Sequence, residues 1–138
     1  MEIITKSEQQ TYEFAKNYAK TLVGGEILLL GGELGAGKTV FTKGLADGLG
    51  VDEYVTSPTF TIMNEYQGML TLCHVDAYRL KSGEEAFATG ITEYFGQSGV
   101  VCCIEWWQNI RSAIAGKTVK VEIEYLGEEE RKISINEQ

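Results

Sequence analysis

The sequence has few basic residues, which limits the partners that it can attract by charge. Twelve lysines and arginines stand against twenty aspartates and glutamates in 138 residues, for a formal net charge of −8. A surface of this sign repels the phosphate backbone of nucleic acids and the anionic heads of lipids. Charge-driven binding of RNA by this chain itself is therefore not expected.

Cysteines are also few, and their number is odd. Cys73 stands alone, whereas Cys102 and Cys103 are adjacent in the apolar run VVCCIE. Neither a disulfide framework nor a CxxC metal spacing can be drawn, so we interpret all three as core residues in a reducing, cytosolic compartment. No stretch approaches eighteen apolar residues, and the N-terminus has no long apolar core, so neither a membrane span nor export is indicated.

The chain does contain enough apolar residues, 43%, to build one hydrophobic core, and its length is typical of one domain. We therefore expect a single domain over residues 1–138. Its first half predicts a helix over 7–25, capped by Ser7 and Gln10, with one face formed by Tyr12, Ala15, Tyr18, Ala19 and Leu22. A buried apolar strand over 26–32 and a second helix over 38–50 follow.

The second half predicts mostly strands. Residues 61–78 read as two strands with a turn near Gln67 and Gly68, 82–96 as short helical turns, 99–105 as a second buried strand, and 106–115 as a short helix. Residues 118–135 alternate as a hairpin, and Val119, Val121, Ile123 and Tyr125 are expected on its core face. This order predicts an α/β fold: a three-layer, P-loop NTPase-like domain with a mainly parallel central sheet and a C-terminal antiparallel hairpin.

A glycine-rich loop between the first buried strand and the second helix carries the clearest chemical signal. Gly32, Gly37, Lys38 and Thr39 satisfy the pattern G-x-x-x-x-G-K-[ST]. Glycines let backbone N–H groups approach phosphates, and the start of the helix adds its positive dipole end. Lys38 is expected at the β and γ phosphates and the Thr39 hydroxyl on magnesium, so the predicted ligand is a Mg-nucleoside triphosphate.

A magnesium ion held by one hydroxyl and two phosphates requires a nearby carboxylate, typically at the end of a neighbouring parallel strand. Asp76 ends the run LTLCHV, and Glu105 ends VVCCI. Glu105 better fits the strand-end acid of a Walker B site, bound directly or through water. For either residue, an ordinary cap or an exposed strand end is the alternative interpretation.

Four further side chains carry weaker signals. A lone His74 is more often a packed or hydrogen-bonded residue than a catalytic one. Arg79 fits a phosphate or carboxylate contact and a surface position equally well. Trp106 and Trp107 favour core and rim packing over base stacking.

Other features of the sequence indicate which nucleotide the loop binds and which class of protein this is. The [NT]-K-x-D signature of guanine-specific proteins does not occur, which favours ATP. Small-molecule kinases with this loop usually carry several arginines on a lid, whereas this chain has only Arg79, Arg111 and Arg131. A small kinase that phosphorylates a metabolite remains the alternative to an ATPase, and a nucleotide-dependent binding module without meaningful catalysis is a third hypothesis.

Four motifs taken together resemble one family. GELGAGKT at the loop, SPTF at 57–60, HVDAYRL at 74–80 and IEW at 104–106 occur in the order and at the separations of the TsaE family, also called YjeE or YdiB. The resemblance runs from the first helix to the terminal hairpin. It implies a cytoplasmic ATPase, weak alone, that serves the TsaB–TsaD complex in threonylcarbamoyladenosine modification of tRNA beside the anticodon. Contact with tRNA would be only indirect, through that complex.

The resemblance also implies roles for individual residues. Lys38 is expected in both nucleotide binding and catalysis, Thr39 and Glu105 hold magnesium, Asp76 and Glu105 support catalysis, and Thr59 in SPTF belongs to a segment that senses the γ-phosphate. Arg131 is expected to approach the nucleotide from the terminal hairpin. The nucleotide-binding loop itself comprises Glu33, Leu34, Gly35, Ala36, Gly37, Lys38, Thr39 and Val40.

One departure lies inside the site. The family commonly has a second threonine after the lysine and threonine of the loop, whereas this chain has Val40. Any role of that second hydroxyl is therefore absent or moved to another residue.

Overall fold

The computed structural model describes residues 1–33, 36–58 and 61–137, which form a sheet with the strand order β1-β7-β6-β2-β5-β4-β3. The strands are β1 (Glu2–Thr5), β2 (Ile27–Gly32), β3 (Met63–Tyr66), β4 (Thr71–Asp76), β5 (Val100–Glu105), β6 (Thr118–Tyr125) and β7 (Arg131–Glu137). The four central strands β6, β2, β5 and β4 run parallel, and β1, β7 and β3 pair antiparallel at the two sides. The predicted α/β class with a mainly parallel centre is confirmed.

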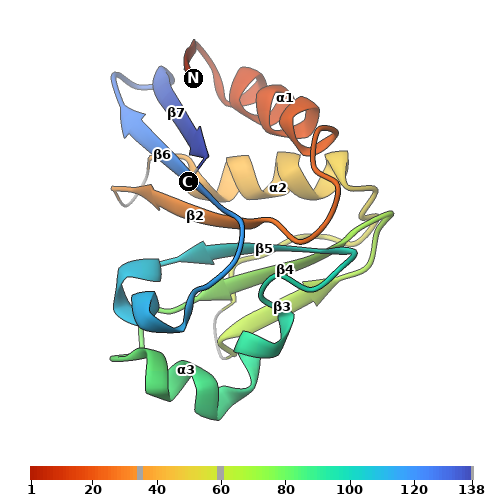
Figure 1. The fold of residues 1–138 in the computed structure, drawn as a ribbon. Coiled ribbons are helices and arrows are strands. Elements are labelled where there is room, and N and C mark those ends of the chain that lie inside the picture. The colour runs from red at the N-terminus through yellow and green to blue at the C-terminus, as the bar shows by residue number, and fades with distance from the viewer. Residues whose placement is uncertain (34–35, 59–60, 138) are drawn as a thin grey trace.

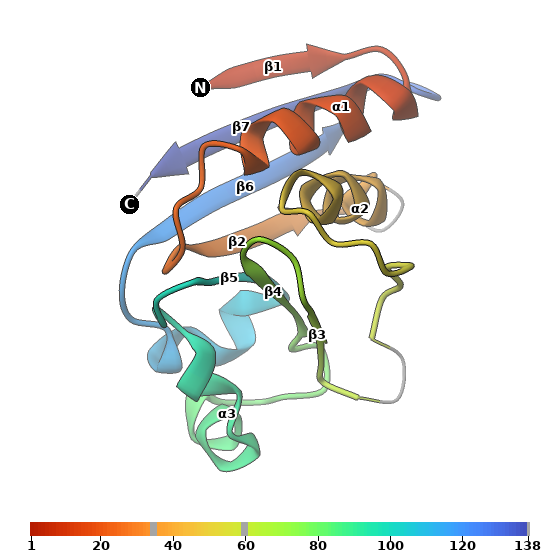
Figure 2. The same ribbon diagram turned by 90° about the vertical axis from the view of Figure 1, so that its right-hand side faces the viewer.

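Helices cover the two faces of this sheet (Figures 1 and 2). Helices α1 (Glu8–Ala19) and α2 (Lys38–Gly48) lie together on one face, and α3 (Gly83–Thr89) lies on the other with the 3-10 helices η1 (Ile91–Tyr94) and η2 (Trp107–Ala113). The apolar strands β2 and β5 are buried because both of their faces pack against helices. No helix in the described part of the chain is long and apolar enough to cross a membrane.

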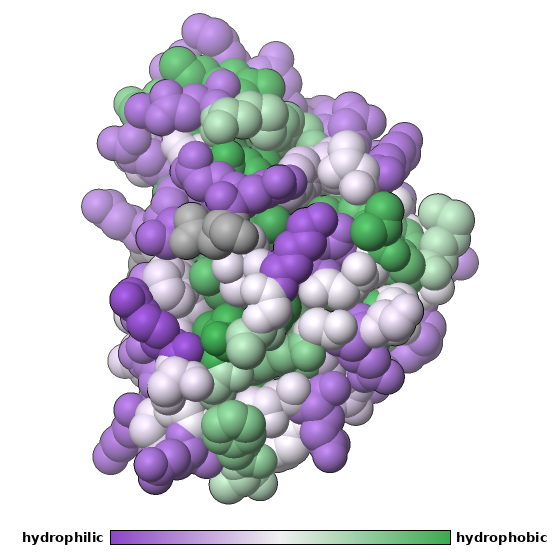
Figure 3. Space-filling view, in the orientation of Figure 1, coloured by the Kyte–Doolittle hydropathy of each residue, from purple (hydrophilic) through white to green (hydrophobic). Residues whose placement is uncertain are grey.

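Alternate residues of β2 point their side chains into two separate hydrophobic cores. Leu28 and Leu30 pack toward α1 and α2, whereas Ile27 and Leu29 pack toward η2 and α3. The three cysteines are buried and unpaired, as predicted for core residues. On the face drawn in Figure 3, the surface is largely polar or neutral, and apolar residues form small separate groups.

Helix α1 begins as predicted but ends earlier. The Ser7 hydroxyl accepts a hydrogen bond from the Gln10 backbone N–H at 3.1 Å, which confirms the cap. The prediction of helix to residue 25 is wrong, because the bonds after Ala19 close tighter turns, from Thr21 N–H to Tyr18 O and from Leu22 N–H to Ala19 O. The Glu26 carboxylate then accepts hydrogen bonds from the Val23 and Gly24 N–H groups and holds the turn into β2.

Three further features differ from the sequence prediction. Strand β1 was not predicted, because EIIT is four residues long and its pairing partner β7 lies at the other end of the chain. Tyr125 was expected on the core face of the hairpin but is 52% exposed, since it ends β6 beyond the covering helix and its ring instead meets the Arg131 guanidinium at 4.6 Å. Thr11, rather than Tyr12, is buried under α1, where its hydroxyl bonds that of Thr5 at 2.7 Å.

Small residues allow α1 and α2 to approach closely. A Cβ placed on Gly44 would lie 2.3 Å from the Tyr12 carbonyl oxygen, and one on Gly48 would lie 2.2 Å from that of Lys16 and 2.6 Å from the Ala19 Cβ. Real Cβ atoms do not approach backbone oxygens so closely, so the contact requires glycine at both positions. This packing fixes α2, and with it the loop that precedes Lys38.

The close approach of α1 and α2 leads to a prediction about the stability of the protein. An alanine in a helix interior is ordinarily about 1 kcal/mol more favourable than glycine, but Gly48→Ala should instead lower the free energy of unfolding by about 1–3 kcal/mol, because the helices must separate. Denaturant unfolding measures the change. Asn17→Ala, at an exposed position of α1, is the control and should stay within about 0.5 kcal/mol of the parent. An unchanged or raised stability of Gly48→Ala would contradict the packing argument.

Candidate functional site

A cleft of about 460 Å³ lies where β2, β4 and β5 end and α2 begins. Carboxyl ends of parallel strands meet at one edge of a sheet, where α/β proteins bind ligands. The structure therefore brings together most of the residues that the sequence nominated. The lining residues are Gly32, Glu33, Gly37, Lys38, Thr39, Val40, Ser57, Asp76, Glu105 and Trp106.

The glycine-rich loop forms one wall of this cleft. It leaves β2 at Gly32 and enters α2 at Lys38, and Gly37 caps the helix with φ +102°, a left-handed conformation that favours glycine. Leu34 and Gly35 lie outside the described residues. Because the first backbone N–H groups of α2 have no partners within the helix, this end of α2 presents donors and a positive dipole to the cleft.

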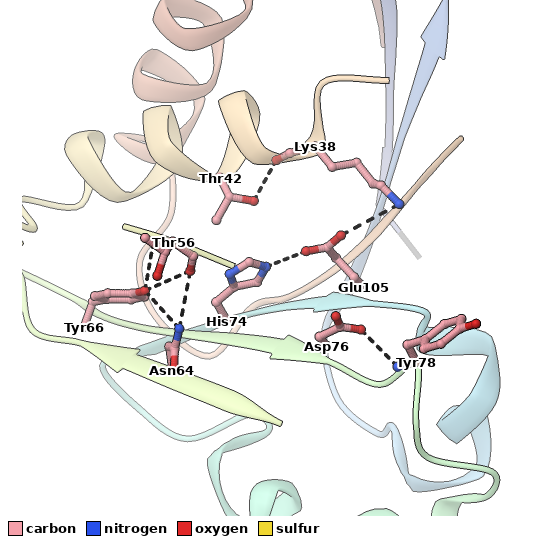
Figure 4. A network of polar contacts seen from close by, with 9 residues as sticks. All are labelled: Lys38, Thr42, Thr56, Asn64, Tyr66, His74, Asp76, Tyr78 and Glu105. Atoms are coloured by element: carbon pink, nitrogen blue, oxygen red, sulfur yellow. Dashed lines mark hydrogen bonds and ion pairs between the residues drawn. The ribbon is translucent and has the colours of Figure 1, made fainter. Parts of the chain in front are cut away.

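Lys38, Glu105 and His74 form a chain of polar contacts that runs from the wall of the cleft into the protein (Figure 4). The Lys38 Nζ lies 3.8 Å from Glu105 Oε1, and His74 Nε2 lies 2.7 Å from Glu105 Oε2. The three side chains come from α2, β5 and β4, and only 13%, 14% and 2% of them, respectively, are exposed. The two oxygens of the Glu105 carboxylate thus contact different side chains, Oε1 that of Lys38 and Oε2 that of His74.

The charge state of Glu105 follows from these neighbours. Burial raises the pKa of its carboxyl, but the hydrogen bond and charge of His74 and the charge of Lys38 lower it, and the net pKa is below the ordinary value. Glu105 is therefore ionised at neutral pH. Since an ionised carboxylate only accepts hydrogen bonds, the Nε2 atom of His74 carries a hydrogen and donates it to Oε2.

Asp76 stands beside Glu105 at the same sheet edge. Strands β4 and β5 are parallel and in register, with Asp76 opposite Glu105. The Asp76 Oδ1 accepts a hydrogen bond from the Tyr78 backbone N–H at 3.0 Å, which orients the carboxylate at the start of the loop after β4. Glu105 is nearer to the glycine-rich loop, because β5 pairs directly with β2 whereas β4 does not.

These oxygen donors fit a magnesium ion. Thr39 is exposed in the first turn of α2, and its hydroxyl has no hydrogen-bond partner among the described residues. With the Glu105 and Asp76 carboxylates it offers hard oxygen ligands at one end of the cleft. The described residues contain no group of three His, Cys, Asp or Glu side chains that would enclose a metal. Magnesium tolerates such an open site, since water and phosphate oxygens usually complete its shell.

Arg131 holds the glycine-rich loop from the terminal hairpin. Its Nε donates to the Ala36 carbonyl oxygen at 2.8 Å, and its Nη1 donates to the Gly127 and Glu130 carbonyl oxygens at 2.8 Å each. The family resemblance implies that Arg131 approaches the nucleotide, which stays a prediction, and the structure has it against the backbone of the loop. One guanidinium thus ties the hairpin turn to the residue before Gly37.

The segment before SPTF is anchored to β3. The Tyr66 hydroxyl donates to the Thr56 carbonyl oxygen at 3.1 Å, and the Asn64 amide donates to the same oxygen at 3.3 Å (Figure 4). Ser57, the next residue, lines the cleft. Thr59 and Phe60 lie outside the described residues, so the γ-phosphate role expected of Thr59 stays a prediction.

Trp106 forms the rim of the cleft in an unusual backbone conformation. Its φ is +59°, the only positive value at a non-glycine among the described residues, and its side chain is 46% exposed. The Lys38 Nζ lies 5.8 Å from its ring centroid, and the Tyr78 ring meets it edge-on at 5.0 Å. Strained residues of this kind concentrate at functional sites. Trp107, in contrast, is buried.

Val40, the departure from the family pattern, is half-buried and lines the cleft. The next hydroxyl on α2 belongs to Thr42, which is buried and donates to the Lys38 carbonyl oxygen at 2.9 Å. Thr42 is therefore directed along its own helix and does not replace a hydroxyl at position 40.

His74 is buried and hydrogen-bonded, which is the interpretation that the sequence favoured, but the sequence did not indicate its partner. As a lone histidine within an apolar strand it favoured a structural role, and only the register of β4 with β5 reveals its contact with Glu105. Arg79, the other open question in that motif, is exposed and has no partner among residues 1–33, 36–58 and 61–137.

Comparison with known proteins agrees with this geometry. The model of the family described as "Threonylcarbamoyl adenosine biosynthesis protein TsaE" matches residues 5–133. The protein named "tRNA threonylcarbamoyladenosine biosynthesis protein TsaE" of Treponema pallidum is 41% identical over 98% of this chain and 99% of its own length. Its namesake from Bacillus subtilis is 42% identical over 94% of this chain and 81% of its own length.

A solved structure shows the same fold. The crystal structure of Bacillus subtilis YdiB superposes with a TM-score of 0.80 at 37% sequence identity, and the match covers 99% of this chain and 84% of that chain. The family match over most of the chain and these full-length relatives lead to one assignment: the chain belongs to the TsaE family.

Proposed function

We propose that this protein binds ATP with magnesium in the cleft between α2 and the ends of β4 and β5, and hydrolyses it. The observation that carries the proposal is the contact between Lys38 of the glycine-rich loop and Glu105, the acid that ends the neighbouring parallel strand, at 3.8 Å. A lysine facing the phosphates and a strand-end carboxylate beside it are the pair that phosphoryl transfer requires.

The chemistry follows from how Glu105 is held. Phosphate oxygens that enter the cleft attract Lys38 away from Glu105, because they carry more negative charge. Glu105 Oε1 is then available for a metal ion, while the hydrogen bond to Oε2 from His74 keeps the carboxylate aimed at the cleft. Magnesium, when bound, would neutralise charge that develops on the phosphates.

Asp76 has a separate role in this proposal. One of its oxygens is occupied by the Tyr78 N–H, and its carboxylate lines the cleft beside Glu105. We assign to it the orientation of the water that attacks the γ-phosphorus, since a fixed carboxylate can accept a hydrogen bond from that water. Attack breaks the bond between the γ-phosphorus and the bridging oxygen, and ADP and phosphate leave.

The biological role comes from the family. Relatives named for tRNA threonylcarbamoyladenosine biosynthesis support a place for this chain in that modification. We propose that it acts in the cytoplasm on a complex of TsaB and TsaD, and that tRNA is reached only through that complex, in keeping with the net charge of −8. A pull-down of TsaB and TsaD with and without ATP and magnesium tests the partner, and retention under neither condition would exclude it.

Lys38→Ala should weaken binding of Mg-ATP by about 10- to 150-fold, the equivalent of about 1.5–3 kcal/mol for charged hydrogen bonds. Isothermal titration calorimetry measures the dissociation constant. Lys43→Ala is the matched control, because Lys43 lies on the same helix, lies over the Tyr54 ring and does not line the cleft. Equal affinities of the two variants would show that the nucleotide does not bind here.

Glu105→Gln should lower ATP turnover by about 100-fold, the scale of losing one electrostatic group in a transition state, while ADP binding without magnesium changes little. A phosphate-release assay at several magnesium concentrations separates the two effects, with Glu124→Gln on the exposed face of β6 as control. The variant should also fail to support tRNA modification when combined with TsaB and TsaD. Full turnover in Glu105→Gln would remove Glu105 from the mechanism, and a phosphorylated metabolite in place of free phosphate would favour the kinase alternative.

Arg131→Lys keeps the positive charge but cannot span the carbonyls of Ala36 and Gly127. We expect a dissociation constant for Mg-ATP about 5- to 13-fold higher, from roughly 1–1.5 kcal/mol of lost hydrogen bonding that positions the loop. The turnover number at saturating ATP should stay within about 3-fold of the parent, since Arg131 orients the loop rather than the reacting atoms. Lys132→Arg, the neighbouring basic residue, should change neither value.

A further inference from the structure

A second cleft, of about 250 Å³, lies on the face of the sheet opposite α1 and α2. It is lined by Leu29 of β2, Trp107 and Arg111 of η2, Ile114, and Thr118 and Lys120 of β6. Thr118 and Lys120 alternate with the buried Val119 and Val121, so they face away from the core that contains α2. None of these residues lines the nucleotide cleft.

Two positive charges meet at one ring in this cleft. The Arg111 Cζ lies 5.0 Å and the Lys120 Nζ 5.2 Å from the centroid of the Trp107 ring. Neither cation forms an ion pair with any residue in the described ranges. Glu122, the next acid on this face of β6, has its carboxylate over Gly31 instead. In a chain of net charge −8, two unpaired cations at one ring mark a local site for an anion.

The Trp107 side chain supplies an independent observation. The residue is only 6% exposed, and its indole Nε1 is buried with no hydrogen-bond acceptor in the described part of the chain. Buried donors are normally satisfied, and an unsatisfied one calls for a partner. An anion held at this ring would lie close to that donor, and its negative charge would reduce the repulsion between Arg111 and Lys120.

The walls of the cleft restrict the kind of anion. Leu29, Ile114 and the Trp107 ring give it an apolar lining beside the two charges. Its volume is below the roughly 300–1,000 Å³ of sites for drug-sized ligands, so it accommodates a group of a few heavy atoms. A planar carboxylate matches the fork of an arginine, and a short aliphatic stem matches the apolar wall. We propose that this cleft binds a carboxylate carried on a short apolar stem, either of a free small acid or of an acidic side chain on a polypeptide.

Nuclear magnetic resonance of the indole N–H groups tests the proposal directly. The chain has two tryptophans, so the signal that persists in Trp106→Phe belongs to Trp107. Glutarate and a blocked peptide with a single glutamate are the two probes, titrated to about 10 mM, ten times the dissociation constant of a millimolar site. We expect at least one of them to shift the Trp107 signal saturably. Response to glutarate identifies a small acid as the source, and response to the peptide alone identifies a polypeptide.

Variants test whether the carboxylate binds at Arg111 and Lys120. Arg111→Gln combined with Lys120→Gln should weaken binding at least 10-fold, and each single change at least 3-fold. The matched control is Lys81→Gln combined with Lys117→Gln, which removes the same charge at two exposed positions that do not line the cleft and should bind like the parent. The amide spectrum of each variant reports whether it is folded, and the single variants serve if the double variant is not.

Several results would overturn the proposal. Absence of a saturable shift with both carboxylates would do so, as would an equal response to neutral glutaramide, since the charge would then not matter. A response to phosphate as strong as that to the carboxylates would replace a carboxylate site with a general anion site. Undiminished binding by the Arg111 and Lys120 double variant would place the ligand elsewhere. None of these readouts depends on ATP, so they stand apart from the proposed function.

Discussion

The carboxylate of Glu105 is shared between two side chains from different elements, and the rest of the candidate site is arranged around it. His74 holds one oxygen at 2.7 Å, and Lys38 lies 3.8 Å from the other. This sharing is possible only because β4 and β5 are parallel and in register, with β5 directly beside β2. A slip of one residue would turn each strand's side chains to the opposite face and separate the three groups. The parallel register is thus the constraint that brings these three groups together at the cleft.

The glycine-rich loop depends on supports that lie far from it in the sequence. Its helix is fixed against α1 by backbone-to-backbone proximity at Gly44 and Gly48, and its N-terminal side is tied to the last hairpin by Arg131. Two helices whose backbones touch cannot move independently, because a close-packed interior passes a displacement of one element on to its neighbour. The first helix and the final hairpin therefore contribute to the site without contributing a residue that lines the main cleft.

Local sequence signals predicted the parts of the fold that are locally determined. The cap at Ser7, the apolar runs of β2 and β5, and the alternation of the hairpin all encode their own structure. Features that depend on distant pairing were not predictable. Strand β1 forms only because it pairs with β7, and the contact of His74 with Glu105 forms only because β4 lies beside β5. The glycine-rich pattern located Lys38 and Thr39 directly, since that chemistry resides in consecutive residues. The contact of Arg131 with the Ala36 carbonyl was not predictable, because a backbone carbonyl carries no sequence signal.

The two consecutive tryptophans line different clefts. Trp106 lines the cleft beside Lys38 and Glu105, and Trp107 lines the cleft that contains Arg111 and Lys120 on the η2 side of the sheet. A 3-10 helix has about three residues per turn, so neighbouring side chains point in different directions. Trp106, with its positive φ, is the residue at which η2 begins. That conformation is unfavourable for a bulky residue, so it persists only while packing on both sides maintains it. A change in the backbone at Trp106 would therefore move the walls of both clefts together, which gives the strained residue a structural reason to stand where β5 ends.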